Sequence, residues 1–104
     1  MTTPTVAEIV TFRLKPDVNP DEFSAAAHAM TPFLRSTGAM LSRSLSADQN
    51  GLWTDHITWT TMKAAQEAAK AMFEQPEAGP FMGMIDPADM VMRHAHLQVY
   101  LPPE

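Results

Sequence analysis

The sequence contains no cysteine, and it has only four glycines and one tyrosine in 104 residues. Without cysteine the chain can form neither disulfides nor zinc–thiolate sites, and it has no thiol nucleophile. A basic cluster is also missing, because seven Lys and Arg stand against twelve Asp and Glu, for a formal net charge of −5. Nucleic-acid binding needs Lys and Arg gathered on one surface, so we expect no nucleic-acid partner.

Long hydrophobic runs are absent as well. No stretch approaches the roughly 20 apolar residues of a membrane-spanning helix, and residues 1–5 lack the basic start and apolar run of a secretion signal. We therefore expect a cytoplasmic protein without a membrane partner. The hydrophobic share of 45% and the charged share of 18% are typical of a globular chain. The length suits one domain over residues 1–104.

The spacing of apolar residues predicts alternating strands and helices. Strands are expected over residues 5–14, 39–47, 52–60 and 90–101, and helices over 20–36 and 61–75. Asn19 is a predicted N-cap, Pro32 should kink or shorten the first helix, and Asn50-Gly51 predicts a hairpin turn. Residues 77–89 are expected to form a loop with room for one helical turn.

This order, βαββαβ, predicts a ferredoxin-like α+β fold with a four-stranded antiparallel sheet and two helices on one face. The apolar alternation of the last strand suggests which side faces the helices, namely Val91, Ala95, Leu97, Val99 and Leu101. The other side would then carry Met90, Met92, His94, His96, Gln98 and Tyr100, next to a polar row with His56 in the third strand. A face of this mixed character predicts an interface or a ligand pocket.

Four segments of the chain resemble a known group of proteins. They are Ala7–Pro16, Asp55–Trp59 leading into an Ala-rich helix, Pro80-Phe81-Met82 with Ile85-Asp86, and Val91–His94. Together with the element order, they are similar to antibiotic-biosynthesis-monooxygenase-like proteins of the dimeric α+β barrel superfamily. The resemblance implies a homodimer that pairs through its sheet faces around a cavity. It implies less about the reaction, because members include cofactor-free monooxygenases, haem-degrading enzymes, isomerases and dehydratases.

The histidines of the chain are the first candidates for chemistry. His94 and His96 lie two residues apart on one strand, so their side chains share a face, and His56 lies in the third strand. Imidazole can take and give a proton near neutral pH, which predicts proton transfer by His94 and His56. A metal pair and purely structural histidines are the alternatives. His94 also matches the pattern of the resembled group.

Glu8 is the least expected carboxylate, because it interrupts an apolar strand. If it faces a cavity, burial would raise its pKa and suit it to proton transfer. His96, Met92, Tyr100 and Trp59 are predicted to contact a substrate, although a Trp more often fills a core. Arg13 and Arg43 could each hold an anionic group of a substrate, or each could lie on the surface. Copper binding by the methionines and haem binding by His94 are weaker alternatives, and we predict neither a metal nor a cofactor.

No phosphate-binding glycine loop, nucleophile elbow or His-Glu-x-x-His motif occurs in the sequence. The combined prediction is a cofactor-independent monooxygenase- or isomerase-like protein that binds a small aromatic or polyketide-like molecule. The alternative is a non-catalytic dimer that binds a small ligand or serves as a stress or accessory protein. The sequence does not decide whether the chain is an enzyme.

Overall fold

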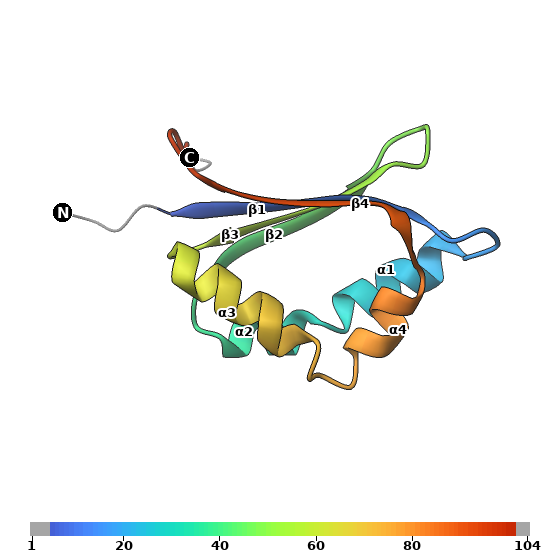
Figure 1. Ribbon diagram of the computed structural model, residues 1–104, viewed down its shortest axis with the longest axis horizontal. Coiled ribbons are helices and arrows are strands. Elements are labelled where there is room, and N and C mark those ends of the chain that lie inside the picture. The colour runs from blue at the N-terminus through green and yellow to red at the C-terminus, as the bar shows by residue number, and fades with distance from the viewer. Residues whose placement is uncertain (1–4, 102–104) are drawn as a thin grey trace.

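The computed structural model describes residues 5–101 as one sheet covered on one face by helices (Figure 1). The strands are β1 (Val6–Leu14), β2 (Met40–Ala47), β3 (Trp53–Trp59) and β4 (Ile85–His96). The helices are α1 (Pro20–His28), α2 (Thr31–Ser36), α3 (Met62–Met72) and α4 (Ala78–Gly83). All strand pairs are antiparallel, in the order β2-β3-β1-β4. The predicted ferredoxin-like fold is confirmed.

The first predicted helix is two helices in the structure. Asn19 caps α1 as expected, since its side chain accepts a hydrogen bond from the backbone N–H of Asp21 at 2.8 Å. The chain leaves helical pairing after His28 and resumes it at Thr31, with Pro32 in the first turn of α2. Proline fits there because the first turn of a helix has no partners for its N–H groups.

The segment between α3 and β4 was predicted as a loop and contains more structure than expected. It forms α4, and β4 begins at Ile85 instead of Met90. Pro87 is tolerated because it lies in the stretch of the edge strand β4 between Asp86 and Val91 that has no ladder partner, so its missing N–H breaks no ladder bond. The strand also ends at His96, short of the predicted Leu101.

The pairing of β4 corrects the predicted orientation of its side chains. Opposite Phe12, four residues of β4 bulge between the pairs Thr11↔Val91 and Arg13↔Asp86. Beyond the bulge, His94 pairs with Glu8 and Met92 with Val10, so these side chains lie on the helix-covered face. Val91 and Ala95 lie on the uncovered face with Thr11 and Ala7. The apolar alternation misled because both sides of this strand mix apolar and polar residues, and His94 lies on the covered side while Val91 and Ala95 lie on the open one.

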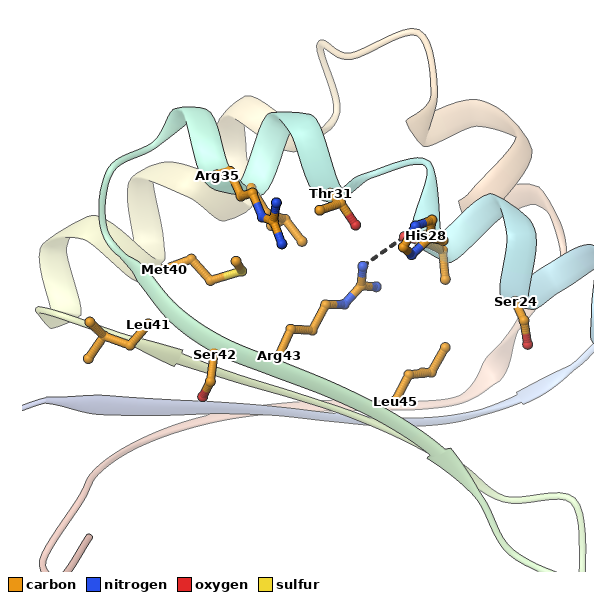
Figure 2. A pocket seen from close by; sticks show the side chains of 11 residues that line it. Ser24, His28, Thr31, Arg35, Met40, Leu41, Ser42, Arg43 and Leu45 are labelled. Carbon is orange, nitrogen blue, oxygen red and sulfur yellow. Dashed lines mark hydrogen bonds between the residues drawn. The ribbon is translucent and has the colours of Figure 1, made fainter. Parts of the chain in front are cut away.

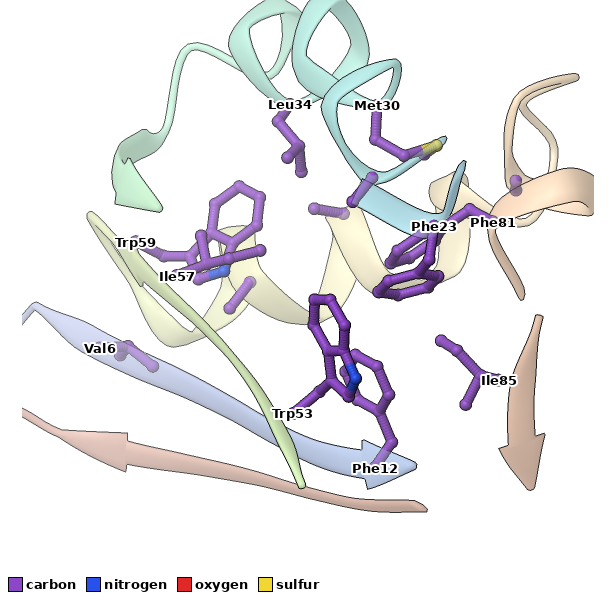
Figure 3. Packing of buried hydrophobic residues seen from close by; sticks show 14 residues of the cluster. Val6, Phe12, Phe23, Met30, Leu34, Trp53, Ile57, Trp59, Phe81 and Ile85 are labelled. Carbon is purple, nitrogen blue, oxygen red and sulfur yellow. The ribbon is translucent and has the colours of Figure 1, made fainter. Parts of the chain in front are cut away.

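The hydrophobic core fills the space between the sheet and the helices (Figure 3). Its centre is aromatic: the ring of Phe23 lies 5.0 Å from that of Trp53, 5.3 Å from Phe81 and 5.5 Å from Phe12, measured between centroids. Edge-to-face and offset contacts of this kind add to the gain from burial. No helix in residues 5–101 is long and apolar enough to cross a membrane.

Candidate functional site

A row of polar side chains crosses the helix-covered face of the sheet. We call it the polar cluster; each strand contributes one member, and the four are Arg43 in β2, Asp55 in β3, Glu8 in β1 and His94 in β4. Strand pairing brings them together. Glu8 pairs with His94 on one side and with Ile57 on the other, and Arg43 also pairs with Ile57. Asp55 is two residues from Ile57 on the same face, so it lies diagonally next to both Arg43 and Glu8. The cluster is unusual because the rest of this face is a hydrophobic core.

Glu8 and His94 form the first pair of the polar cluster. The Nε2 atom of His94 lies 2.9 Å from Oε1 of Glu8, which is hydrogen-bonding distance. Glu8 is buried, with 6% of its surface exposed. Burial raises the pKa of the Glu8 carboxyl above its usual value, and the hydrogen bond and charge of His94 offset this only in part. Glu8 is therefore a better proton acceptor than an exposed glutamate.

Arg43 and Asp55 form the second pair of the polar cluster. The guanidinium donates from Nε and Nη2 to the two carboxylate oxygens at 3.0 and 2.7 Å, a bidentate arrangement. Its Nη1 also donates to the backbone carbonyl of Ala27 in α1 at 2.7 Å. The Asp55 charge raises the pKa of Glu8 and the Arg43 charge lowers it, so the two pairs are electrostatically linked.

An apolar cavity of about 80 Å3 lies above the polar cluster, between sheet and helices. Among the described residues, the charged ones that line it are Glu8, Asp55 and Arg43, and we call it the inner cavity. Five of the lining residues are methionines: Met30, Met72, Met82, Met90 and Met92. Methionine side chains are flexible and adapt to ligands of different shape. The arrangement presents a proton-accepting carboxylate to an apolar guest.

A second depression, of about 730 Å3, lies between α1, α2 and the edge strand β2 (Figure 2). We call it the outer groove. Its lining includes Arg43 and Leu34, which also line the inner cavity. These two side chains therefore stand between the groove and the inner cavity. The volume falls within the range of about 300–1,000 Å3 that is usual for small-molecule sites.

The structure brings together only some of the predicted site residues. Glu8 and His94 are in contact, and Met92 lines the inner cavity. His56 does not join them, because it pairs with Ile9 and lies on the uncovered face. His94 and His96 share a face as predicted, but within residues 5–101 no three His, Asp or Glu side chains gather into a set suited to a metal ion.

The other predicted substrate contacts lie outside the two depressions. Trp59 is buried in the core and has no hydrogen-bond partner for its indole N–H within the described chain. His96 is exposed near the end of β4, and Tyr100 is exposed beyond it. None of the three lines the inner cavity or the outer groove.

Sequence reasoning missed Asp55 as a member of the site. The signal was present, because Asp55 alternates with Trp53, Ile57 and Trp59 on the face predicted to meet the helices. A carboxylate in such a row must find a partner when it is buried. Arg43 was recognised as a possible anion-binding residue, but its pairing with Asp55 follows only from the register of β2 against β3.

Solved structures of several proteins have the same fold. A variant of SnoaB, a cofactor-independent oxygenase from Streptomyces nogalater, superposes with a TM-score of 0.74 at 15% identity, over 97% of this chain and 100% of that one. A Bordetella bronchiseptica protein, provisionally assigned as an antibiotic biosynthesis monooxygenase, gives 0.78 at 12% identity, over 93% and 100%. A dimeric ferredoxin-like protein of unknown function from Thermobifida fusca gives 0.70 at 15% identity, over 91% and 92%.

These likenesses establish the fold of the chain. No protein-family model and no curated protein sequence matches it. The predicted resemblance to antibiotic-biosynthesis-monooxygenase-like proteins is confirmed at the level of the fold.

Proposed function

We propose that this chain is a cofactor-independent monooxygenase-like enzyme that acts on a small aromatic or polyketide-like molecule in the inner cavity. One observation carries the proposal: a buried carboxylate, Glu8, with a raised pKa and a histidine partner, lines an otherwise mostly apolar cavity. The fold shared with a cofactor-independent oxygenase and with a provisionally assigned monooxygenase is consistent with it.

Glu8 is the proton acceptor in this proposal. An oxygenase without a cofactor must draw electrons from a substrate anion, so it needs a base to form that anion. The Glu8 carboxylate accepts a proton from an enolisable or phenolic substrate, and the resulting anion is then able to reduce dioxygen. His94 orients the carboxylate through the 2.9 Å contact and keeps its pKa from rising further.

Substrate entry requires the inner cavity to expand. Its volume of about 80 Å3 is smaller than the cavity of about 150 Å3 that admits benzene in a protein core. The methionines that line it can change rotamer at small cost, because their side chains are unbranched. Substrate size is therefore set by how far Met72 and Met92 move aside.

A Glu8→Gln variant tests the role of the carboxylate. With anthrone, an enolisable aromatic ketone, as the probe, we expect the wild type to consume one dioxygen for each anthraquinone and water formed. Glu8→Gln should lower this rate about 10²-fold or more, the usual contribution of a general base. The rate is measured with an oxygen electrode and by quinone absorbance.

Glu67→Gln is the matched control, because it makes the same change on an exposed residue of α3. It should leave the rate unchanged. An equal rate for wild type and Glu8→Gln would refute the proposal. Tight binding of aromatic probes without turnover would favour the alternative, a non-catalytic ligand-binding dimer.

A homodimer through the uncovered sheet face is part of the proposal. No helix within residues 5–101 covers that face (Figure 1), and Ala7, Ile9, Val91 and Ala95 lie on it among serine, threonine, arginine and histidine side chains. A sheet face that no helix covers and that mixes apolar and polar side chains is typical of a protein interface. A second copy of the chain is the occupant we favour, because a structural neighbour of the same fold is dimeric.

A further inference from the structure

The outer groove has a charge character opposite to that of the whole chain. It is lined by two of the seven Lys and Arg residues, Arg35 and Arg43, and by His28, but by none of the Asp and Glu residues within residues 5–101. The chain itself carries a formal net charge of −5. A positively charged groove attracts anions locally, even on a protein whose net charge is negative.

Arg35 is the cation of the groove that has donors to spare. Arg43 is already neutralised by Asp55 and held by the Ala27 carbonyl. Arg35 forms no salt bridge and donates no side-chain hydrogen bond within the described residues. Figure 2 shows Arg35 extending from α2, and Arg43 from β2, into the same space. A planar guanidinium without a partner is suited to bidentate binding of a carboxylate.

The remainder of the groove is suited to an apolar body attached to that carboxylate. Leu34, Met40 and Leu45 line it together with hydroxyl groups of Ser24 and Thr31. An inorganic anion would leave these apolar side chains in contact with water. An amphipathic acid would cover them and place its charge on Arg35 at the same time.

We propose that the outer groove is a binding site for the carboxylate of an amphipathic organic acid, with Arg35 as its anchor. The acid lies against Arg43 and Leu34, and the inner cavity lies on the other side of these two side chains. The site is independent of the chemistry proposed for Glu8, because Glu8 does not line the groove.

Binding of 2-naphthoate tests this proposal, with 2-naphthamide as the neutral probe of nearly equal shape. Calorimetry should show that the wild type binds the acid more tightly than the amide. Arg35→Gln should weaken naphthoate binding about tenfold, the usual effect of losing a charge-assisted hydrogen bond. Arg35→Lys, which keeps the charge, should weaken it less.

Two controls separate this site from general electrostatics and from the inner cavity. Lys70→Gln removes the same charge from an exposed residue of α3 and should leave naphthoate binding unchanged. Glu8→Gln should also leave it unchanged, even if that variant abolishes anthrone oxidation. Amide chemical shifts of Thr31 and Ser42 should move on addition of naphthoate.

Several results would overturn the assignment. Equal weakening by Arg35→Gln and Lys70→Gln would show that only net charge matters. Equal binding of acid and amide would exclude a carboxylate site, and tighter binding of 1-naphthyl phosphate would make the ligand a phosphate ester instead. Loss of naphthoate binding in Glu8→Gln, but not in Arg35→Gln, would place the acid in the inner cavity.

Discussion

At the scale of single residues, the behaviour of Glu8 follows from two opposing influences. Removal from water disfavours its charged form, and the His94 side chain 2.9 Å away favours it. Desolvation is the larger influence, so the pKa of the carboxyl remains above its usual value. A base of this kind becomes active at a higher pH than an exposed glutamate would.

Replacement of His94 should therefore move the acid limb of the pH–rate profile upward. In wild type, kcat/KM for anthrone should rise with pH as Glu8 ionises, through a pKa above 4.5. His94→Gln removes the imidazole that lowers the pKa of Glu8 through its hydrogen bond and charge, so that pKa rises further and the limb shifts to higher pH. His28→Gln, on α1, is the control and should not move the limb. A downward shift in His94→Gln would contradict the assigned role.

The same raised pKa has a consequence for folding stability. The folded state holds a proton on Glu8 at pH values where the unfolded chain has lost it, so this group stabilises the fold most below pH 4.5. That contribution disappears as pH rises through the folded-state pKa. Burial of Glu8 at neutral pH thus lowers stability, which is consistent with a residue kept for chemistry.

At the scale of elements, the Arg43–Asp55 pair joins the edge strand β2 to β3 and to α1. Side-chain exposure is only 14% for Arg43 and 8% for Asp55, so loss of one partner leaves a nearly buried charge uncompensated. Asp55→Asn should lower the free energy of unfolding by about 3 kcal/mol in urea denaturation. The double variant Arg43→Met, Asp55→Leu should recover most of that loss, because it removes both charges.

Glu67→Gln is again the matched change, made in the exposed Lys63–Glu67 pair at 3.9 Å. It should cost less than about 0.5 kcal/mol, as exposed pairs do. A similar cost for Asp55→Asn and Glu67→Gln would mean that the Arg43–Asp55 pair contributes no more than a surface ion pair.

The existence of the strands could be predicted from the sequence, but the orientation of one of them could not. In β1 and β3 the alternation is strong, because one side carries large apolar residues such as Phe12 and Trp59. In β4 both sides mix apolar and polar residues, and the four-residue bulge opposite Phe12 sets which side meets the helices. Such a bulge depends on pairing between distant segments, which local patterns do not encode.

The contacts within the candidate site also depend on pairing between distant segments, so local sequence patterns could predict only part of them. Glu8 stood out because a carboxylate interrupts an apolar strand, and that reasoning uses only local sequence. Its contact with His94, 86 residues away, depends on the register of β1 against β4. His56 was grouped with His94 because both were assigned to one face, whereas strand pairing separates them.

At the scale of the whole molecule, the two faces of the sheet have different roles in our proposals. The covered face holds the polar cluster and the inner cavity, and the open face is available for a partner. Pairing through the open face would leave the outer groove accessible, because the groove lies between β2 and the helices of the other layer. Ligand binding and dimer formation should therefore be separable by mutation.

Val91→Glu tests the dimer. Val91 is 55% exposed and lies on the open face, so a glutamate there would bury a charge from each copy in the interface. Analytical ultracentrifugation should show a dimeric wild type and a dissociation constant raised at least tenfold in the variant. The control is Gln66→Glu, which adds the same charge at an exposed position of α3; this variant should remain dimeric. A monomeric wild type, or a fully dimeric Val91→Glu, would refute this interface.

The polar cluster takes one residue from each of the four strands, and this ties the candidate site to the folding reaction. No hairpin or single βα unit contains all four members, and a slip of one residue in any strand turns its member to the opposite face. The Arg43–Asp55 pair can form within the β2–β3 hairpin, but the complete cluster needs all four strands in register. Recovery of function during refolding should therefore coincide with the slowest strand pairing, that of β1 with β4, which joins the two ends of the chain.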